Sequence, residues 1–301
     1  MSLEALNPDR VEAVLVRHGA KAVTLTDAGN LAVLEPAPGE TPLWQDTRIT
    51  GLFDADLDVE ALKRDLQLSL SIDRLPEHRL VPLYDRDWER EWLEDFRPMR
   101  FGERLWICPG GMTVDAVDAV IVELDPGLAF GTGSHATTAL CLEWLDGLEL
   151  TGKTLLDYGC GSGILAIAAL KLGAARVLGT DIDSQAIAAS ERNAIRNSVA
   201  ARLDLETAST GIDGRYDFVV ANILAGPLVE LAPTIAAAVH VDGQLALSGV
   251  LAEQVEQVTA AYAQWFEFDE PVFKPQDGQT WARLSGTRSG RNKSGRGRTG
   301  R

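Results

Sequence analysis

The stretch that most constrains the fold of this chain runs from Thr154 to Gly163 and reads TLLDYGCGSG. Its apolar start, closed by Asp157, is typical of a buried parallel strand, and an apolar helical run follows the last glycine. Gly159, Gly161 and Gly163 stand at every second position between them. Glycine permits positive φ and close backbone approach, and a helix N-terminus offers free N–H groups to an anion. The stretch therefore predicts a strand, turn and helix that cradle a small ligand.

The spacing of these glycines leaves more than one interpretation open. The dinucleotide fingerprint is G-x-G-x-x-G, whereas this loop reads acid-x-G-x-G-x-G, so the match is imperfect. A glycine-rich turn with no ligand is the other interpretation. The ends of the later strands are needed to decide between them.

Strands and helices alternate through the second half of the chain, after the apolar run Val117–Leu124 and a helix capped by Ser134. We expect strands at 154–158, 176–181, 202–207, 216–222, 244–248, 266–273 and 280–285, and helices at 164–172, 184–197, 227–239 and 252–264. This order predicts an α/β fold with a doubly wound, Rossmann-like and mainly parallel sheet. Ligands of such sheets bind at the carboxyl ends of the strands.

The first part of the chain has a different pattern. We expect a helix from Pro8 to Gly19, strands near 23–25, 31–33, 48–53 and 79–83, and a helix over 59–70. With a first strand in Ser2–Leu6 this order is that of a smaller ferredoxin-like α+β domain. The segment contains no catalytic constellation, so we interpret it as a partner-recognition domain, with a purely structural appendage as the alternative.

These patterns divide the chain into four parts. We predict a substrate-recognition domain at 1–84, a linker helix or hinge at 85–112, a ligand-binding domain at 113–286 and a disordered basic tail at 287–301. Trp88, Trp92 and Phe96 stand four residues apart on the charged linker helix, which Pro98 ends. These three aromatic side chains act at a hinge between the domains, pack on the surface of one domain, or do both. The tail is interpreted as a solubilising extension, with nucleic-acid contact as the alternative.

Composition and charge limit the kinds of partner that the chain can bind. The formal net charge is −16 although the tail holds six basic residues and no acid, so the folded body is strongly acidic. Such a body excludes direct non-specific nucleic-acid binding and attracts basic proteins. The three cysteines form neither a disulfide framework nor a metal motif, and there is neither a signal segment nor a membrane-length apolar run. We expect a cytoplasmic, monomeric protein with no metal and no membrane partner.

Two later strand ends agree with the glycine loop. RVLGTD ends in Asp181, which is placed to accept both hydroxyls of a ribose, and Asp183 is expected to cap the next helix. YDFVVAN ends in Asn222, followed by Ile223 and Leu224. Here N-I-L-A resembles the Asn/Asp-Pro-Pro-Tyr/Phe motif of methyltransferases that act on nitrogen. An amine that attacks a sulfonium methyl must aim its lone pair at the methyl carbon. Hydrogen-bond acceptors must therefore hold its N–H bonds on the side of the nitrogen that faces away from that carbon.

With these residues in place, nearly the whole chain closely resembles the PrmA family of bacterial protein methyltransferases. The resemblance covers PGET, DWEREW, MRFGERLWICP, DPGLAFGTGSHATT, DYGCGSGILAIAALKLGA, GTDID, ANILAGPL and LSGVLA. It implies a class I methyltransferase that uses S-adenosyl-L-methionine to methylate lysines and the N-terminal α-amine of large-subunit ribosomal protein L11. It also implies that a ferredoxin-like domain grips this substrate and that a flexible linker moves the domains.

The resemblance also places the functional residues. Cofactor contacts fall on Thr138, Gly159, Gly161, Asp181 and Asn222, and Phe130, Gly131 and Thr132 look like a lid over the cofactor. Methyl transfer is assigned to Asn222, Ile223 and Leu224, where the acceptors are the Asn222 side-chain oxygen and a backbone carbonyl of Ile223 or Leu224.

Two other classes of protein remain open at this stage. A nicotinamide-dependent oxidoreductase would share the glycine loop and Asp181, but it requires G-x-G-x-x-G and gives Asn222 no role. A non-catalytic adaptor predicts damage to the loop or to Asn222, and neither is damaged. Because the chain offers no paired carboxylates, nucleophile elbow or metal cluster, positioning and amine desolvation are expected to supply the catalysis.

Overall fold

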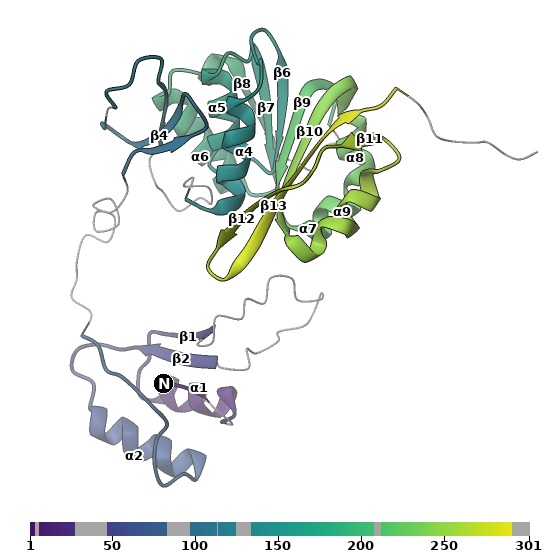
Figure 1. The fold of residues 1–301 in the computed structure, drawn as a ribbon. Helices are drawn as coiled ribbons and strands as arrows, with labels where there is room; N and C mark the ends of the chain where they lie inside the picture. The colour runs from purple at the N-terminus through teal and green to yellow at the C-terminus, as the bar shows by residue number, and fades with distance from the viewer. Residues whose placement is uncertain are drawn as a thin grey trace, which may run out of the picture. The chain divides into compact units, whose positions relative to one another are not determined.

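The fold was taken from a computed structural model of the chain (Figure 1). The structure describes residues 1–3, 6–27, 47–82, 97–112, 114–124, 134–207 and 212–290. The chain divides into two compact units, Met1–Arg86 and Asp87–Arg301. Within the described residues, no helix is both long enough and apolar enough to cross a bilayer.

The first unit packs two helices on a two-stranded antiparallel sheet. Its elements are α1 (Pro8–Arg17), β1 (Ala22–Asp27), β2 (Thr47–Leu52) and α2 (Val59–Leu70). Asn7 accepts from the Arg10 N–H at 3.1 Å and Asp58 from the Ala61 N–H at 2.9 Å, so each helix begins at a side-chain cap. The apolar stripes of both helices meet the sheet in one core: Leu3, Val11, Val14, Leu15, Ile49, Leu62, Leu66 and Leu70.

One expectation for this unit was wrong. Residues 79–82 form no strand; Leu80 and Val81 are exposed, and Pro82 has no N–H to give a ladder. The first strand expected in Ser2–Leu6 is present only as a short pairing: Ser2 bridges Arg48 antiparallel, and the backbones of Met1 and Leu3 bond to Ile49 and Thr47 of β2. The strand expected at 31–33 lies outside the described residues, so the ferredoxin-like assignment stays a prediction.

The second unit is built on a mixed sheet of eight strands. Seven of them run in the order β11-β13-β10-β9-β6-β7-β8, and β12 pairs with β13. The bounds are β6 (Thr154–Tyr158), β7 (Arg176–Asp181), β8 (Leu203–Thr207), β9 (Tyr216–Asn222), β10 (Val239–Leu251), β11 (Phe266–Phe268), β12 (Val272–Gln276) and β13 (Gln279–Arg288). The strands from β10 to β8 pair in parallel, whereas β11, β12 and β10 pair with β13 antiparallel. The expected doubly wound, mainly parallel sheet is confirmed.

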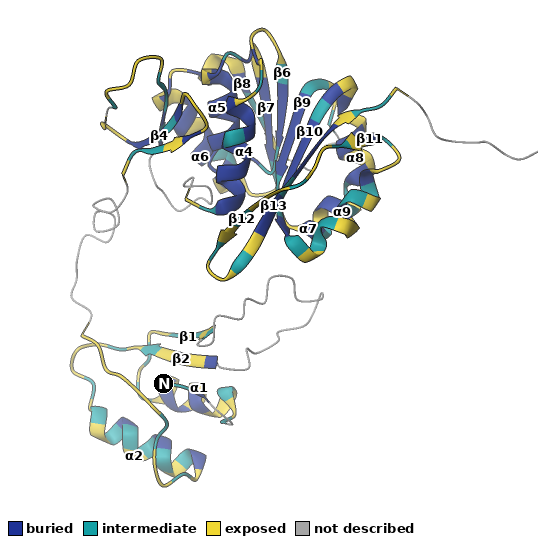
Figure 2. Ribbon diagram, viewed as in Figure 1, coloured by how far each residue is buried: buried dark blue, intermediate teal, exposed yellow. Residues whose placement is uncertain are grey.

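Helices cover both faces of this sheet (Figure 1). On one side lie α4 (Ala136–Asp146), α5 (Ile164–Lys171) and α6 (Ser184–Arg196). On the other lie α7 (Ala225–Glu230), α8 (Ala232–Ala237) and α9 (Val255–Tyr262), with short 3₁₀ turns η1 (Ala200–Arg202) and η2 (Ala252–Gln254) between elements. Figure 2 shows that the central strands β6, β7 and β9 are mostly buried between these layers. The sheet therefore has two apolar cores, one on each face.

Two helix boundaries differ from the expectation. The helix predicted at 227–239 is two short helices that meet at Leu231, because Pro233 at the start of α8 has no N–H to continue the first one. The N-cap of α4 is His135 rather than Ser134, since the His135 ring accepts from the Thr137 N–H at 3.3 Å.

A small sheet of β3 (Met99–Phe101), β4 (Leu105–Pro109) and β5 (Val120–Leu124) completes the second unit. Its apolar side chains join the core under α4 and α5, where Leu105, Ile107 and Val122 are fully buried. Residues 99–109 were expected in a linker at 85–112, but they are part of this packed unit, because their alternating apolar residues have a core to enter. The predicted linker helix falls mostly outside the described residues.

Asn197, just after α6, attaches this small sheet to the end of that helix. Its Nδ2 donates to the Glu123 carbonyl at 2.7 Å and to the Asn193 carbonyl at 2.9 Å, and its Oδ1 accepts from the Glu123 N–H at 2.8 Å. The side chain is buried, so water cannot replace these bonds.

We therefore expect Asn197→Ala to lower the free energy of unfolding by about 1–3 kcal/mol, because the backbone N–H and carbonyl of Glu123 lose their buried side-chain partner. Urea denaturation of the parent and the variant measures the difference in the free energy of unfolding. Gln185→Ala, at an exposed position of α6, is the matched control and should stay within about 0.5 kcal/mol of the parent. Equal effects of the two substitutions would contradict the assigned role of Asn197.

Candidate functional site

The glycine loop between β6 and α5 has the backbone geometry that the sequence predicts. Gly159, Gly161 and Gly163 have φ of +78°, +55° and +78°, values that L side chains rarely adopt. The N–H groups of Gly159 and Cys160 donate to the Thr180 carbonyl at 2.8 and 2.9 Å. The loop is thus tied to the end of β7, beside Asp181.

Asp181 is held against this loop by its own carboxylate. One oxygen accepts from the Gly161 N–H at 2.9 Å and the other from the Asp183 N–H at 3.0 Å. Asp183 in turn accepts from the Gln185 N–H at 2.8 Å, which confirms it as the N-cap of α6. Each Asp181 oxygen keeps a second lone pair, so the fixed carboxylate can still accept from the hydroxyls of a ribose.

Asn222 ends β9 next to the start of the glycine loop, because Tyr158 and Ala221 are register partners in the parallel pair. Its amide nitrogen donates to the Thr138 hydroxyl at 3.3 Å. Thr138 is buried on α4 and is therefore a rigid partner. With the amide nitrogen engaged, the amide oxygen is the group that Asn222 offers to a donor.

The next two residues lie at different depths. Ile223 is half-buried and touches the glycine loop: a Cβ on Gly159 would stand 2.3 Å from Ile223 Cγ2. Leu224 is 46% exposed and precedes the first residue of α7. Phe130, Gly131 and Thr132, expected as a lid, lie outside the described residues. The structure thus brings Thr138, Gly159, Gly161, Asp181, Asn222 and Ile223 to one edge of the sheet.

Asp157 at the end of β6 is a fully buried acid under the loop. Its Oδ2 accepts from the Ala166 N–H at 3.0 Å, whereas its Oδ1 has no hydrogen-bond partner among the described residues. Burial raises the pKa of Asp157 to about 7, because the charged form loses its hydration. A buried oxygen without a donor fits a ligand that brings a cationic or N–H group.

Sequence reasoning missed two residues of α6 that hold the loop. The Ser190 hydroxyl donates to the Gly161 carbonyl and the Asn193 amide to the Ser162 carbonyl, both at 2.9 Å. A signal was available: Ser190, Asn193 and Asn197 are spaced three and four apart, so they form a polar stripe on one face of the helix. Such a stripe on the buried side of a helix indicates specific backbone partners.

Two residues of reactive types, Cys160 in the loop and His135 at the N-cap of α4, have structural surroundings. Cys160 is buried, and burial raises the pKa of its thiol to about 12, so it is not a nucleophile at neutral pH. The ring centroids of His135 and the buried Trp281 are 4.8 Å apart, edge to face, and burial lowers the pKa of His135. The described residues contain no group of His, Cys, Asp or Glu side chains arranged to hold a metal ion.

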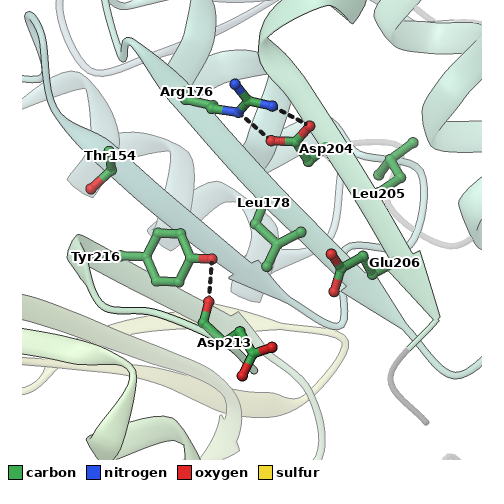
Figure 3. A pocket seen from close by; sticks show the side chains of 8 residues that line it. All are labelled: Thr154, Arg176, Leu178, Asp204, Leu205, Glu206, Asp213 and Tyr216. Carbon is green, nitrogen blue, oxygen red and sulfur yellow. Dashed lines mark hydrogen bonds and ion pairs between the residues drawn. The ribbon is translucent and has the colours of Figure 1, made fainter. Parts of the chain in front are cut away.

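A cavity of about 770 Å³ lies elsewhere on the sheet (Figure 3). Thr154, Arg176 and Tyr216, the first residues of β6, β7 and β9, line it, and so does Glu206 near the end of β8, so the cavity lies along the strands and not only at their carboxyl ends. Arg176 is paired there with Asp204. None of the predicted site residues lines this cavity, and the site at the carboxyl ends of the strands is the candidate for chemistry.

The fold and the site at the carboxyl ends of the strands together define a Rossmann-like class I methyltransferase. A positive-φ glycine cradle, a fixed carboxylate with free lone pairs and a buried acid oxygen that has no donor among the described residues fit S-adenosylmethionine, which carries an amino acid, a sulfonium and an adenosine. An amide at the end of β9 lies beside this cradle.

Comparisons with known proteins identify the family. Residues 1–289 match the family "Ribosomal protein L11 methyltransferase (PrmA)". A ribosomal protein L11 methyltransferase from Aeromonas hydrophila is 54% identical over 287 residues, 95% of this chain and 96% of the relative, and one from Klebsiella pneumoniae strain 342 is 51% identical over 284 residues, 94% and 96%. A crystal structure of a ribosomal protein L11 methylase from Lactobacillus delbrueckii subsp. bulgaricus aligns with a TM-score of 0.58 at 35% identity, over 64% of this chain and 100% of that one.

The chain therefore belongs to the ribosomal protein L11 methyltransferase (PrmA) family. It is a methyltransferase whose methyl donor is S-adenosylmethionine, as the resemblance implied. The oxidoreductase alternative is set aside, because the family and the amide at the end of β9 both point to methyl transfer.

The environment of Asp157 predicts a dependence of stability on pH. Because the pKa is raised in the folded state, folding takes up a proton between about pH 4 and 7, and the contribution of this group to stability is lost as pH rises through about 7. We expect Asp157→Asn to gain stability relative to the parent, by up to about 1.4 kcal/mol per pH unit, from pH 5 to 7. Chemical denaturation of both ligand-free proteins at several pH values measures the difference, and a pH-independent difference would contradict the assignment.

Proposed function

We propose that this chain methylates lysine side chains and the N-terminal α-amine of large-subunit ribosomal protein L11. The names of its relatives support the substrate, and the placement of Asn222 carries the proposal for nitrogen as the acceptor. Asn222 stands beside the cofactor loop with its amide nitrogen held by Thr138. This arrangement leaves an oxygen where the N–H bonds of a substrate amine can be held.

The bound S-adenosylmethionine would supply an electrophilic methyl group on a positively charged sulfur. The part of the chain's own residues is to hold the amine: the Asn222 oxygen and the carbonyl of Ile223 or Leu224 accept its two N–H bonds. The lone pair of the nitrogen then points away from these acceptors, toward the methyl group. Such fixed orientation of the two reactants is a large source of rate acceleration.

The scheme assigns no side chain as general base. Among the described residues of the site, both oxygens of Asp181 and one oxygen of the fully buried Asp157 accept from backbone N–H groups. They act as anchors in this scheme. A free lysine has a pKa near ~10.4, so the amine must be neutralised on entry, and removal from water beside a cationic cofactor lowers that pKa.

The cofactor contacts follow from the same geometry. Gly159 and Gly161 give it a backbone surface without Cβ atoms, Asp181 accepts from the ribose, and Thr138 holds Asn222 at the methyl end. The lid role of Phe130, Gly131 and Thr132 remains part of the proposal, supported by the family resemblance.

The wider organisation is proposed on the same basis. The first unit, with its own core and no catalytic constellation, would recognise the ribosomal protein, and the acidic body of the chain would attract basic surfaces of a partner through its charge. The protein would act as a cytoplasmic monomer, with no direct nucleic-acid contact by the folded body.

The role of Asn222 gives a direct test. Asn222→Ala should lower the kcat of methyl transfer by about 100-fold or more, because the amine loses its orientation, while the Kd of S-adenosylmethionine rises much less. Asn222→Asp, which keeps an acceptor oxygen, should retain more activity. A labelled-methyl assay on purified ribosomal protein L11 and calorimetry with the cofactor separate the two effects. Normal turnover by Asn222→Ala would refute the assignment.

A further inference from the structure

Strand β10 contains a β-bulge beside the end of β9. In its pairing with β13, Leu247 faces Leu284 but Val250 faces Ala282, so β10 has one extra residue at this point. In its pairing with β9, Ser248 faces Asn222. The Ser248 hydroxyl donates to the Ala282 carbonyl at 2.9 Å and is fully buried, which holds the bulge in place. Bulges bend a strand and are frequent next to active sites.

The residue after Ser248 in this bulge is Gly249, which has a φ of +82°. A Cβ added to Gly249 would stand 2.2 Å from the Ile223 carbonyl oxygen, 2.7 Å from its carbonyl carbon and 3.1 Å from its nitrogen. All three atoms are backbone, so no side-chain rotation relieves the overlap. The absence of a side chain at Gly249 therefore lets the Ile223 peptide lie directly against β10.

The glycine loop packs against Ile223 from a second direction. There, a Cβ on Gly159 would stand 2.3 Å from Ile223 Cγ2, a side-chain atom. Glycines at the ends of two different strands, β6 and β10, thus enclose Ile223, one against its side chain and one against its carbonyl. This enclosure leaves the carbonyl little freedom to shift.

We propose that Gly249 is a positioning residue for methyl transfer: it sets the place of the Ile223 carbonyl that accepts an N–H of the substrate amine. This inference rests on the proposed function, and it selects Ile223 over Leu224 as the source of the carbonyl acceptor. Gly249 does not touch the substrate. It acts through Ile223, whereas Thr138 acts through Asn222, so each of the two acceptors has its own support.

The test compares two glycines with the same backbone requirement. Gly152 has a φ of +73° and no atom within 4 Å of an added Cβ, so Gly152→Ala carries the strain of positive φ alone. Gly249→Ala should lower kcat by about 100-fold, the cost of misplacing a reacting group by about 1 Å. Its KM for the ribosomal protein and its Kd for S-adenosylmethionine should change little. Gly152→Ala should keep its kcat. A Gly249→Ala enzyme with the kcat of the parent would overturn the proposal.

A double-mutant cycle tests the other side of the enclosure, the contact of Gly159 with the Ile223 side chain, in variants that keep Gly249. The overlap at Gly159 is with a side chain, so Gly159→Ala should lower kcat less in an Ile223→Ala background than in the parent. The overlap at Gly249 is with backbone, so its effect should be the same in both backgrounds. Equal losses for Gly159→Ala in the two backgrounds would contradict the enclosure of Ile223.

The two proposals fail in different ways. If Asn222→Ala turns over normally, the proposed placement of the amine is wrong, whatever Gly249→Ala does. If Asn222→Ala is inactive and Gly249→Ala is as active as the parent, the amine site stands and only the role of Gly249 is refuted.

Discussion

The parallel register of β6 with its two neighbours is the constraint on which the site depends. Tyr158 faces Thr180 on β7 and Ala221 on β9, so the residues that follow these strands must meet at one edge. The strand order reverses at β6, which is where open α/β sheets bind ligands. Gly159, Asp181 and Asn222 are far apart in sequence, and each reaches the site only because these strands run in the same direction. A one-residue slip would turn buried residues outward and move the strand ends apart.

Sequence reasoning predicted what depends on local pattern and missed what depends on contact between distant segments. The strands of the parallel sheet were found because their apolar runs are short and end at polar residues such as Asp181 and Asn222. The exposed segment at 79–82 was wrongly expected to be a strand, because apolar residues beside Pro82 look the same with or without a partner strand. Gly249 was missed because a single glycine in a strand does not reveal which backbone lies against it.

The carboxylates of the site show how burial and hydrogen bonding assign different roles to one residue type. Asp181 accepts two backbone N–H bonds and is half-buried, so it is fixed in place and accessible to a ligand. Asp157 is fully buried, one of its oxygens has no donor among the described residues, and burial raises its pKa. A sequence shows two acids at strand ends, but only the surroundings separate a fixed, accessible carboxylate from a buried one.

The polar stripe of α6 extends the site beyond the strand ends. Ser190 and Asn193 hold two carbonyls of the glycine loop, and Asn197, one turn further, holds both backbone groups of Glu123 in β5. Asn197 also donates to the Asn193 carbonyl, so the three residues form one connected face. The helix thus fixes the cofactor loop against the small sheet of β3, β4 and β5. Because those strands share a core with α4, which carries Thr138, the loop and the support of Asn222 belong to the same packed framework, which the proposed mechanism requires because it relies on positioning.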